Sequence, residues 1–189
     1  IVGRDDGTTS RFFGIPIAAD AGGSNRWKAP QPVTPWTTPL EATTEKVCYH
    51  ARTASDVVGT EDCLSVDVLT VTGLTGMAVF CYIHGGGFAS QSGSVPMHDC
   101  EGLMAEGVVV VSINYRLGPF GFLHFPEEGI TNLGIRDMIA ALEWVQANIA
   151  AFGGDKCNVT IFGEPYQQLL TQCKRLDLSM KKELCAELQ

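Results

Sequence analysis

The sequence predicts an α/β fold in which helices flank a mixed, mostly parallel sheet. Residues 108–113 are β-branched almost throughout, as in a strand buried on both faces. Apolar residues then recur at helical spacing from Ile135 to Ile149. A further apolar run follows at 158–163. Strand, helix and strand in this order are typical of a largely parallel sheet covered by helices.

The first half of the chain predicts two further strands. Residues 12–17 are a short apolar run, and the proline- and glycine-rich stretch after them, through Pro39, predicts mostly irregular surface structure. Residues 64–71 alternate apolar and polar side chains, as half-buried strands do. A turn at 72–76 leads to a second strand at 77–83, which we expect to pair antiparallel with the first.

The helix after residue 131 has start and stop signals. Asn132 is a good N-cap residue, and Gly153 and Gly154 supply the C-terminal stop. From residue 165 the pattern changes, because one stripe of an amphipathic helix collects the apolar residues Leu169, Cys173, Leu176, Met180, Leu184 and Leu188.

Composition excludes several classes of partner. The 189 residues carry a net charge of −8, which argues against nucleic acid and anionic membranes. No apolar run approaches the length of a transmembrane helix. No C-x-x-C motif pairs with a second one, so we expect no metal site and no cofactor. The chain begins at Ile1 without a signal-peptide pattern, which suggests a mature chain or a fragment.

Seven cysteines are a high count for a cytosolic protein of this size. Cys48 and Cys63 bracket a short polar segment that would suit a closed loop, and a disulfide there would imply an oxidising compartment. Spacing leaves open that all seven are buried or free thiols. Cys81 lies within an apolar strand and is expected to be a small core residue.

A glycine-rich loop follows the strand at 77–83. In the sequence from His84 to Phe88, three consecutive glycines let backbone N–H groups approach a ligand oxygen. Two such donors stabilise the oxyanion of a tetrahedral intermediate, and this arrangement after a strand is typical of lipases and esterases. The alternative is a turn needed for its backbone shape alone. His84 is expected to be a structural hydrogen-bonding residue and not a general base.

The strand at 158–163 leads into an altered nucleophile elbow. In a G-x-S-x-G elbow a serine follows the glycine and one further residue. Here Gly163 and Glu164 are followed by Pro165, and the second glycine is also absent. Proline has no hydroxyl, and it fixes φ in a turn that is normally strained.

The chain resembles the type-B carboxylesterase/cholinesterase family from about Gly7 to Glu164. Motifs of the family occur in family order, which makes chance similarity very improbable. They are Phe13–Pro16, Arg26–Pro30 with Pro35–Trp36, Glu61–Leu64, His84–Phe88, Asn114–Gly118, Asn132–Gly134 with Asp137, Phe152–Asp155 and Asn158–Glu164.

The resemblance implies the N-terminal part of an α/β-hydrolase fold and hydrolysis of small-molecule carboxylic esters by a Ser–acid–His triad. Gly86 and Gly87 match the oxyanion-hole glycines, and Cys48 and Cys63 match the first disulfide of the family. Arg26 and Glu61 match a structural salt bridge, and Glu164 matches a supporting acid beside the nucleophile. Pro165 occupies the nucleophile position, and the triad acid and histidine of the family lie beyond residue 189.

These matches divide the chain into a partial carboxylesterase-type α/β-hydrolase domain at 1–164 and a divergent helical tail at 165–189. We expect a secreted or extracellular esterase relative that is truncated, inactive as written and prone to self-association through an exposed sheet edge. Two alternatives remain open at this point. One is a non-catalytic cholinesterase-like binding or adhesion module, and the other is a non-functional fragment.

Overall fold

A mixed sheet of six strands forms the centre of the molecule, and the computed structural model describes residues 1–53, 55–94 and 100–163. The strand order is β1-β2-β5-β7-β6-β8. The sheet strands are β1 (Arg4–Asp5), β2 (Thr9–Pro16), β5 (Ser65–Val71), β6 (Met77–Ile83), β7 (Val108–Ile113) and β8 (Gly154–Gly163). A separate hairpin consists of β3 (His50–Thr53) and β4 (Asp56–Val58).

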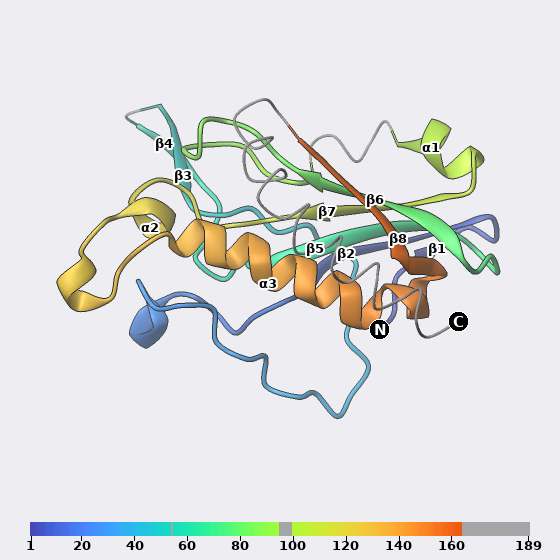
Figure 1. The fold of residues 1–189 in the computed structure, drawn as a ribbon, viewed down its shortest axis with the longest axis horizontal. Coiled ribbons are helices and arrows are strands. Elements are labelled where there is room, and N and C mark those ends of the chain that lie inside the picture. Colours follow the sequence, from blue (N-terminus) through green and yellow to red (C-terminus); the bar gives the residue numbers. More distant parts are fainter. Residues whose placement is uncertain (54, 95–99, 164–189) are drawn as a thin grey trace.

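Helices flank the sheet. The longest, α3, runs along it, and α2 lies near the start of α3 (Figure 1). The helices are α1 (Glu101–Ala105), α2 (Gly118–Phe122) and α3 (Leu133–Asn148), with short 3₁₀ segments η1 (Gly23–Asn25), η3 (Pro126–Glu128) and η4 (Ile149–Phe152). None of the described helices combines the length and apolar character that crossing a bilayer requires.

The sheet has a parallel half and an antiparallel half. Strands β7, β6 and β8 run parallel, whereas β5 is antiparallel to β7, and β2 and β1 continue the antiparallel pattern. The expected pairing of strand 64–71 with strand 77–83 is therefore wrong, because β7 lies between them. The short turn at 72–76 gives no sign of a strand between β5 and β6, because that strand, β7, comes later in the chain.

Strand β7 confirms the prediction of a central strand buried on both faces. Val109 and Val111 pack into the larger core together with Met138, Leu142 and Val145 of α3. Val110 faces the other way and packs with Leu69 and Met104 in a second core beneath α1. Cys81 also belongs to the larger core and is fully buried, as expected.

Three local features add to the expectations or correct them. The run at 12–17 belongs largely to strand β2, whose alternation is broken by a register shift between Phe12 and Ile15. Strand β8 begins at Gly154, earlier than residue 158. Asn132 occupies the N-cap position of α3, but its backbone is left-handed and its side chain makes no capping hydrogen bond. Gly153 caps η4 in a left-handed conformation, as its stop signal predicts.

Candidate functional site

The glycine-rich loop begins at the carboxyl end of β6, in the middle of the parallel half of the sheet. Ile83, the last residue of β6, is in register with Ile113 of β7 and Gly163 of β8. Three parallel strands thus end in one row, where neighbouring strands are about 4.8 Å apart. The loop after Ile83 therefore leaves the sheet beside Gly163, the last residue of β8.

Gly86 and Gly87 have backbone conformations that favour glycine. Their φ angles are 94° and 62°, in the left-handed region. A Cβ on Gly86 would collide with the carbonyl oxygen of Ser90, whereas a Cβ on Gly87 would meet nothing within 4 Å. Gly86 is half-buried and Gly87 is exposed, so a ligand oxygen can reach this part of the backbone.

Hydrogen bonds fix the shape of the loop. The amide N–H of Ala89 and the hydroxyl of Ser90 both donate to the carbonyl oxygen of Gly86, at 3.1 and 3.4 Å. The N–H of Gly118 donates to the Phe88 carbonyl at 2.7 Å, which ties the loop to the start of α2. Phe88 itself has a φ of 63°, and such left-handed strain in non-glycine residues clusters at functional sites.

His84 supports the loop from within the core. Its side chain is fully buried and stacks on Tyr115 with ring centroids 4.4 Å apart. The Tyr115 hydroxyl donates to the His84 carbonyl at 2.9 Å, and His84 Nδ1 lies 3.0 Å from the Gly85 carbonyl. Burial lowers the pKa of His84 to about 4. These contacts describe a neutral structural histidine.

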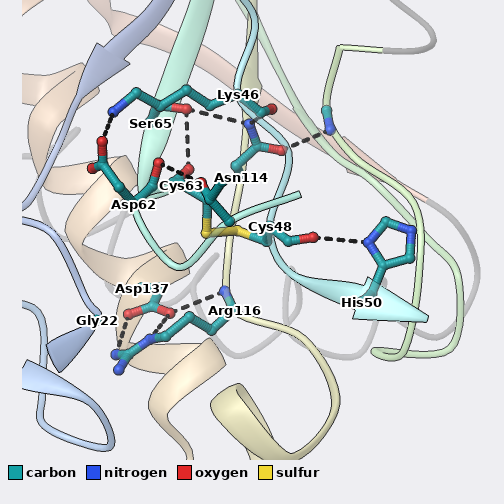
Figure 2. Close-up of a disulfide and its surroundings, with 12 residues drawn as sticks. Gly22, Lys46, Cys48, His50, Asp62, Cys63, Ser65, Asn114, Arg116 and Asp137 are labelled. Atoms are coloured by element: carbon teal, nitrogen blue, oxygen red, sulfur yellow. Dashed lines mark hydrogen bonds and ion pairs between the residues drawn. A yellow bond between two sulfur atoms is a disulfide. The ribbon is translucent and has the colours of Figure 1, made fainter. Parts of the chain in front are cut away.

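A disulfide joins Cys48 and Cys63, the two cysteines that the resemblance pairs, with their Cα atoms 4.9 Å apart (Figure 2). It closes the segment that contains the β3–β4 hairpin. Beside it, the Asn114 amide donates to the Lys46 carbonyl at 2.8 Å and accepts from the Gly93 N–H at 2.9 Å. Asn114 thereby links the disulfide region to the chain that follows the glycine loop.

Arg26 and Glu61 form an ion pair, with Nε donating to Oε2 at 2.7 Å. This hydrogen bond is the main reason why the pKa of Glu61 is lowered. The pair lies at the surface, where such interactions contribute little to stability. Its geometry is compatible with a structural role and provides no catalytic group.

A second ion pair is buried, and sequence reasoning did not find it. Arg116 and Asp137 are 4% and 0% exposed at their side chains, and two guanidinium nitrogens donate to the two carboxylate oxygens at 2.7 Å each. Arg116 also donates to the Lys28 carbonyl at 2.8 Å. The available signal was an aspartate on the apolar face of α3, next to Met138.

The other expected residues of the site fall outside the described part of the chain. Glu164 and Pro165, at the nucleophile elbow, and the tail at 165–189 are among them. Within the described residues, no group of three or more His, Cys, Asp or Glu side chains could hold a metal ion.

Comparison with known proteins identifies relatives of this scaffold. Residues 1–165 match the Carboxylesterase family. The para-nitrobenzyl esterase of Bacillus subtilis is 44% identical over 178 residues, covering 86% of this chain and 36% of the relative. The cholinesterase of Mus musculus is 40% identical over 175 residues, covering 84% of this chain and 29% of the relative.

Solved structures show the same fold. A thermophilic para-nitrobenzyl esterase superimposes with a TM-score of 0.78 at 42% identity, over 85% of this chain and 36% of the esterase. A Geobacillus stearothermophilus carboxylesterase gives a TM-score of 0.77 at 37% identity, over 85% and 35%. The chain therefore spans about a third of the length of these relatives.

Proposed function

The chain belongs to the carboxylesterase family, and on this premise we propose that it is an ester-hydrolase scaffold that retains the oxyanion loop but does not itself hydrolyse esters. The observation that carries the proposal is Pro165, two residues after Gly163, which lies in register with Ile83, the residue before the glycine loop. The fold is that of the α/β-hydrolase esterases.

The glycine loop supports the first half of the proposal. In acyl transfer a hydroxyl attacks the ester carbonyl carbon, and negative charge develops on the carbonyl oxygen. Gly86 and Gly87 are the candidates for donating N–H groups to that oxygen, because the loop leaves the sheet beside β8 and is accessible at Gly87. The stacked pair of His84 and Tyr115 holds the loop in place beneath them.

Pro165 supports the second half of the proposal, namely that the chain does not itself hydrolyse esters. A proline offers no hydroxyl to attack the carbonyl carbon, and its fixed φ does not suit the strained turn of an elbow. His84 is the histidine next to the loop, but its burial and lowered pKa make it a poor general base. Glu164 is assigned a supporting role beside the nucleophile position, by family resemblance.

The substrate class proposed for the scaffold is a small-molecule carboxylic ester. Three relatives are named a para-nitrobenzyl esterase, a fumonisin B1 esterase and a cholinesterase, and each name describes that relative only. Their diversity gives no preference for this chain, so the proposal stays at the level of the ester bond.

Domain division and location follow the same reasoning. We assign residues 1–164 to a partial carboxylesterase-type domain and residues 165–189 to a divergent tail. The Cys48–Cys63 disulfide supports a secreted or extracellular protein, since structural disulfides persist in oxidising compartments.

An ester turnover assay tests the proposal. We expect no measurable hydrolysis of an activated aryl ester by the 189-residue chain, because loss of a triad serine alone lowers turnover by about 10⁶-fold. The para-nitrobenzyl esterase serves as the positive control.

Two glycine variants distinguish intrinsic activity from a contaminant. Gly86→Ala distorts the loop, whereas Gly76→Ala changes a left-handed glycine in an open turn. Turnover that persists in the Gly76 variant and disappears in the Gly86 variant would contradict the proposal.

A further inference from the structure

The sequence contains one N-glycosylation sequon. Asn158, Val159 and Thr160 form the pattern N-x-S/T with a residue other than proline at its centre. The other four asparagines of the chain have no serine or threonine two residues later. Asn158 lies five residues before Gly163, the end of β8, which is about 17 Å along the strand. The sequon is therefore remote from the glycine loop, which leaves the sheet beside Gly163.

The acceptor amide and the hydroxyl that the sequon requires lie on the exposed face of β8. Asn158 and Thr160 are exposed, whereas Val159 and Ile161 are half-buried and pack against the core that contains the apolar residues of α3. Because successive side chains of a strand point to opposite faces, the Asn158 amide and the Thr160 hydroxyl share one face. Both groups are therefore accessible from solvent in the folded chain.

Asn158 also lies outside the regular pairing of β8 with β6. The two residues of β6 that flank Ala78 are in register with Gly154 and Val159. Residues 155–158 of β8 thus stand opposite Ala78 alone, as in a β-bulge. The extra residues of a bulge are left out of the ladder of hydrogen bonds. A group attached to Asn158 therefore does not replace a paired position of the sheet.

The side chain of Asn158 is not used by the fold. It makes no hydrogen bond to any other described residue. The segment before it is held by other groups: Gln146 of α3 donates to the Lys156 carbonyl at 3.0 Å, and the Cys157 N–H donates to the Asp155 carboxylate at 2.8 Å. Replacing one amide hydrogen of Asn158 by a sugar therefore removes no interaction that holds the strand.

We propose that Asn158 carries an N-linked glycan in the folded protein. The donor is a lipid diphosphate-linked oligosaccharide of the secretory pathway. The amide nitrogen of Asn158 bonds to C1 of the first sugar and releases one proton, while the bond from C1 to the diphosphate oxygen breaks and the lipid diphosphate leaves. The proposal rests on the secretory location proposed above, which the Cys48–Cys63 disulfide supports.

The first test supplies the compartment, so its outcome does not depend on the natural location of the protein. The 189-residue chain, preceded by a cleavable secretion signal, is translated with endoplasmic-reticulum microsomes. Peptide N-glycosidase and mass spectrometry then locate the glycan. We expect a glycan at Asn158 in the parent and in Thr160→Ser, and none in Thr160→Val, which keeps the branched shape without the hydroxyl. An unmodified parent inside the microsomes, or a glycan that persists in Thr160→Val, would overturn the proposal.

A second test asks whether the folded chain accommodates the glycan. The glycosylated chain is trimmed to its first sugar, and its urea midpoint is compared with that of the unglycosylated chain. We expect equal midpoints. The matched control is Ala150→Thr combined with Thr160→Val, which moves the sequon to Asn148, whose amide donates to the Trp144 carbonyl at 2.9 Å. A sugar there should lower the midpoint. An equal loss of stability from the sugar at Asn158 would overturn the proposal.

Discussion

Asp67 is a fully buried carboxylate in β5 that forms hydrogen bonds but no ion pair among the described residues. It accepts from the Gly14 N–H at 2.7 Å and from the Ser94 hydroxyl at 2.8 Å. Burial raises its pKa to about 6, although these hydrogen bonds oppose the shift. The ionised form is therefore disfavoured in the folded state relative to the unfolded chain.

The raised pKa fixes the sign of a pH effect. Between the usual pKa of 3.8 and about 6, the folded state binds a proton that the unfolded state has released. The contribution of Asp67 to stability therefore falls as pH rises through this window and stays level above it. Between pH 4 and pH 7 we therefore expect the parent to lose about 2–3 kcal/mol of stability relative to Asp67→Asn, which has no titrating group at this position.

Urea unfolding of both proteins at pH 4 and pH 7 measures this effect. Other carboxylates titrate in both proteins, so the difference between variant and parent isolates residue 67. A difference between variant and parent that is the same at both pH values would rule out a raised pKa at Asp67.

At the scale of elements, Arg116 and Asp137 join the end of β7 to α3. The amide N–H of Arg116 donates to Asp137 as well, so the carboxylate accepts three hydrogen bonds from this one residue. Removing one partner leaves an uncompensated charge in the core. The resulting cost is much larger than for a surface pair such as Arg26 and Glu61.

Asp137→Asn is expected to destabilise the fold by about 3 kcal/mol or more. The control is Arg136→Gln on the exposed side of the same helix, which should stay within about 0.5 kcal/mol of the parent. Urea unfolding at pH 7 provides both values. If the two variants unfold at the same urea concentration, the buried pair does not hold α3 on the sheet.

The elements differ in how much the sequence reveals about them. Strand β7 and helix α3 follow from local patterns, because burial on two faces requires continuous apolar residues and burial on one face requires a helical stripe. The position of β7 between β5 and β6 does not follow from local patterns, because strand pairing depends on contacts between distant segments. Strand β2 is obscured by its register shift between Phe12 and Ile15.

In the candidate site too, the sequence predicts some features and not others. The residues of the glycine loop and of the Cys48–Cys63 disulfide could be named from motifs and family resemblance. The stacking of His84 on Tyr115 and the contact between Arg116 and Asp137 could not, because each joins segments that are separate in the sequence. A motif locates a group along the chain, but the packing around it decides its pKa and accessibility.

On the scale of the whole molecule, β8 lies at an edge of the sheet formed by the described residues. Within the described residues it pairs with β6 alone, and its segment 158–163 contains no charge or proline. Phe162 is 37% exposed and contacts Phe80 and Tyr82 of β6 on the outer face. A long apolar edge of this kind is a template for pairing with another chain.

We expect the chain to self-associate through this edge. Size-exclusion chromatography over a range of concentrations should show the monomer giving way to larger species. Thr160→Lys places a charge on the exposed side of β8 and should reduce this association, whereas Thr75→Lys places the same charge in an exposed turn and should not. A monomer at all concentrations would exclude the edge as an association surface.

The most direct test of an oxyanion scaffold without a nucleophile is covalent labelling by a fluorophosphonate, read by intact mass spectrometry. The 189-residue chain should gain no adduct under conditions that label the para-nitrobenzyl esterase fully. Pro165→Ser should also remain unlabelled, because a serine needs a neighbouring base and His84 is buried with its pKa lowered to about 4. One adduct per chain, mapped to residue 165 of the variant or to any serine of the parent, would contradict the proposal.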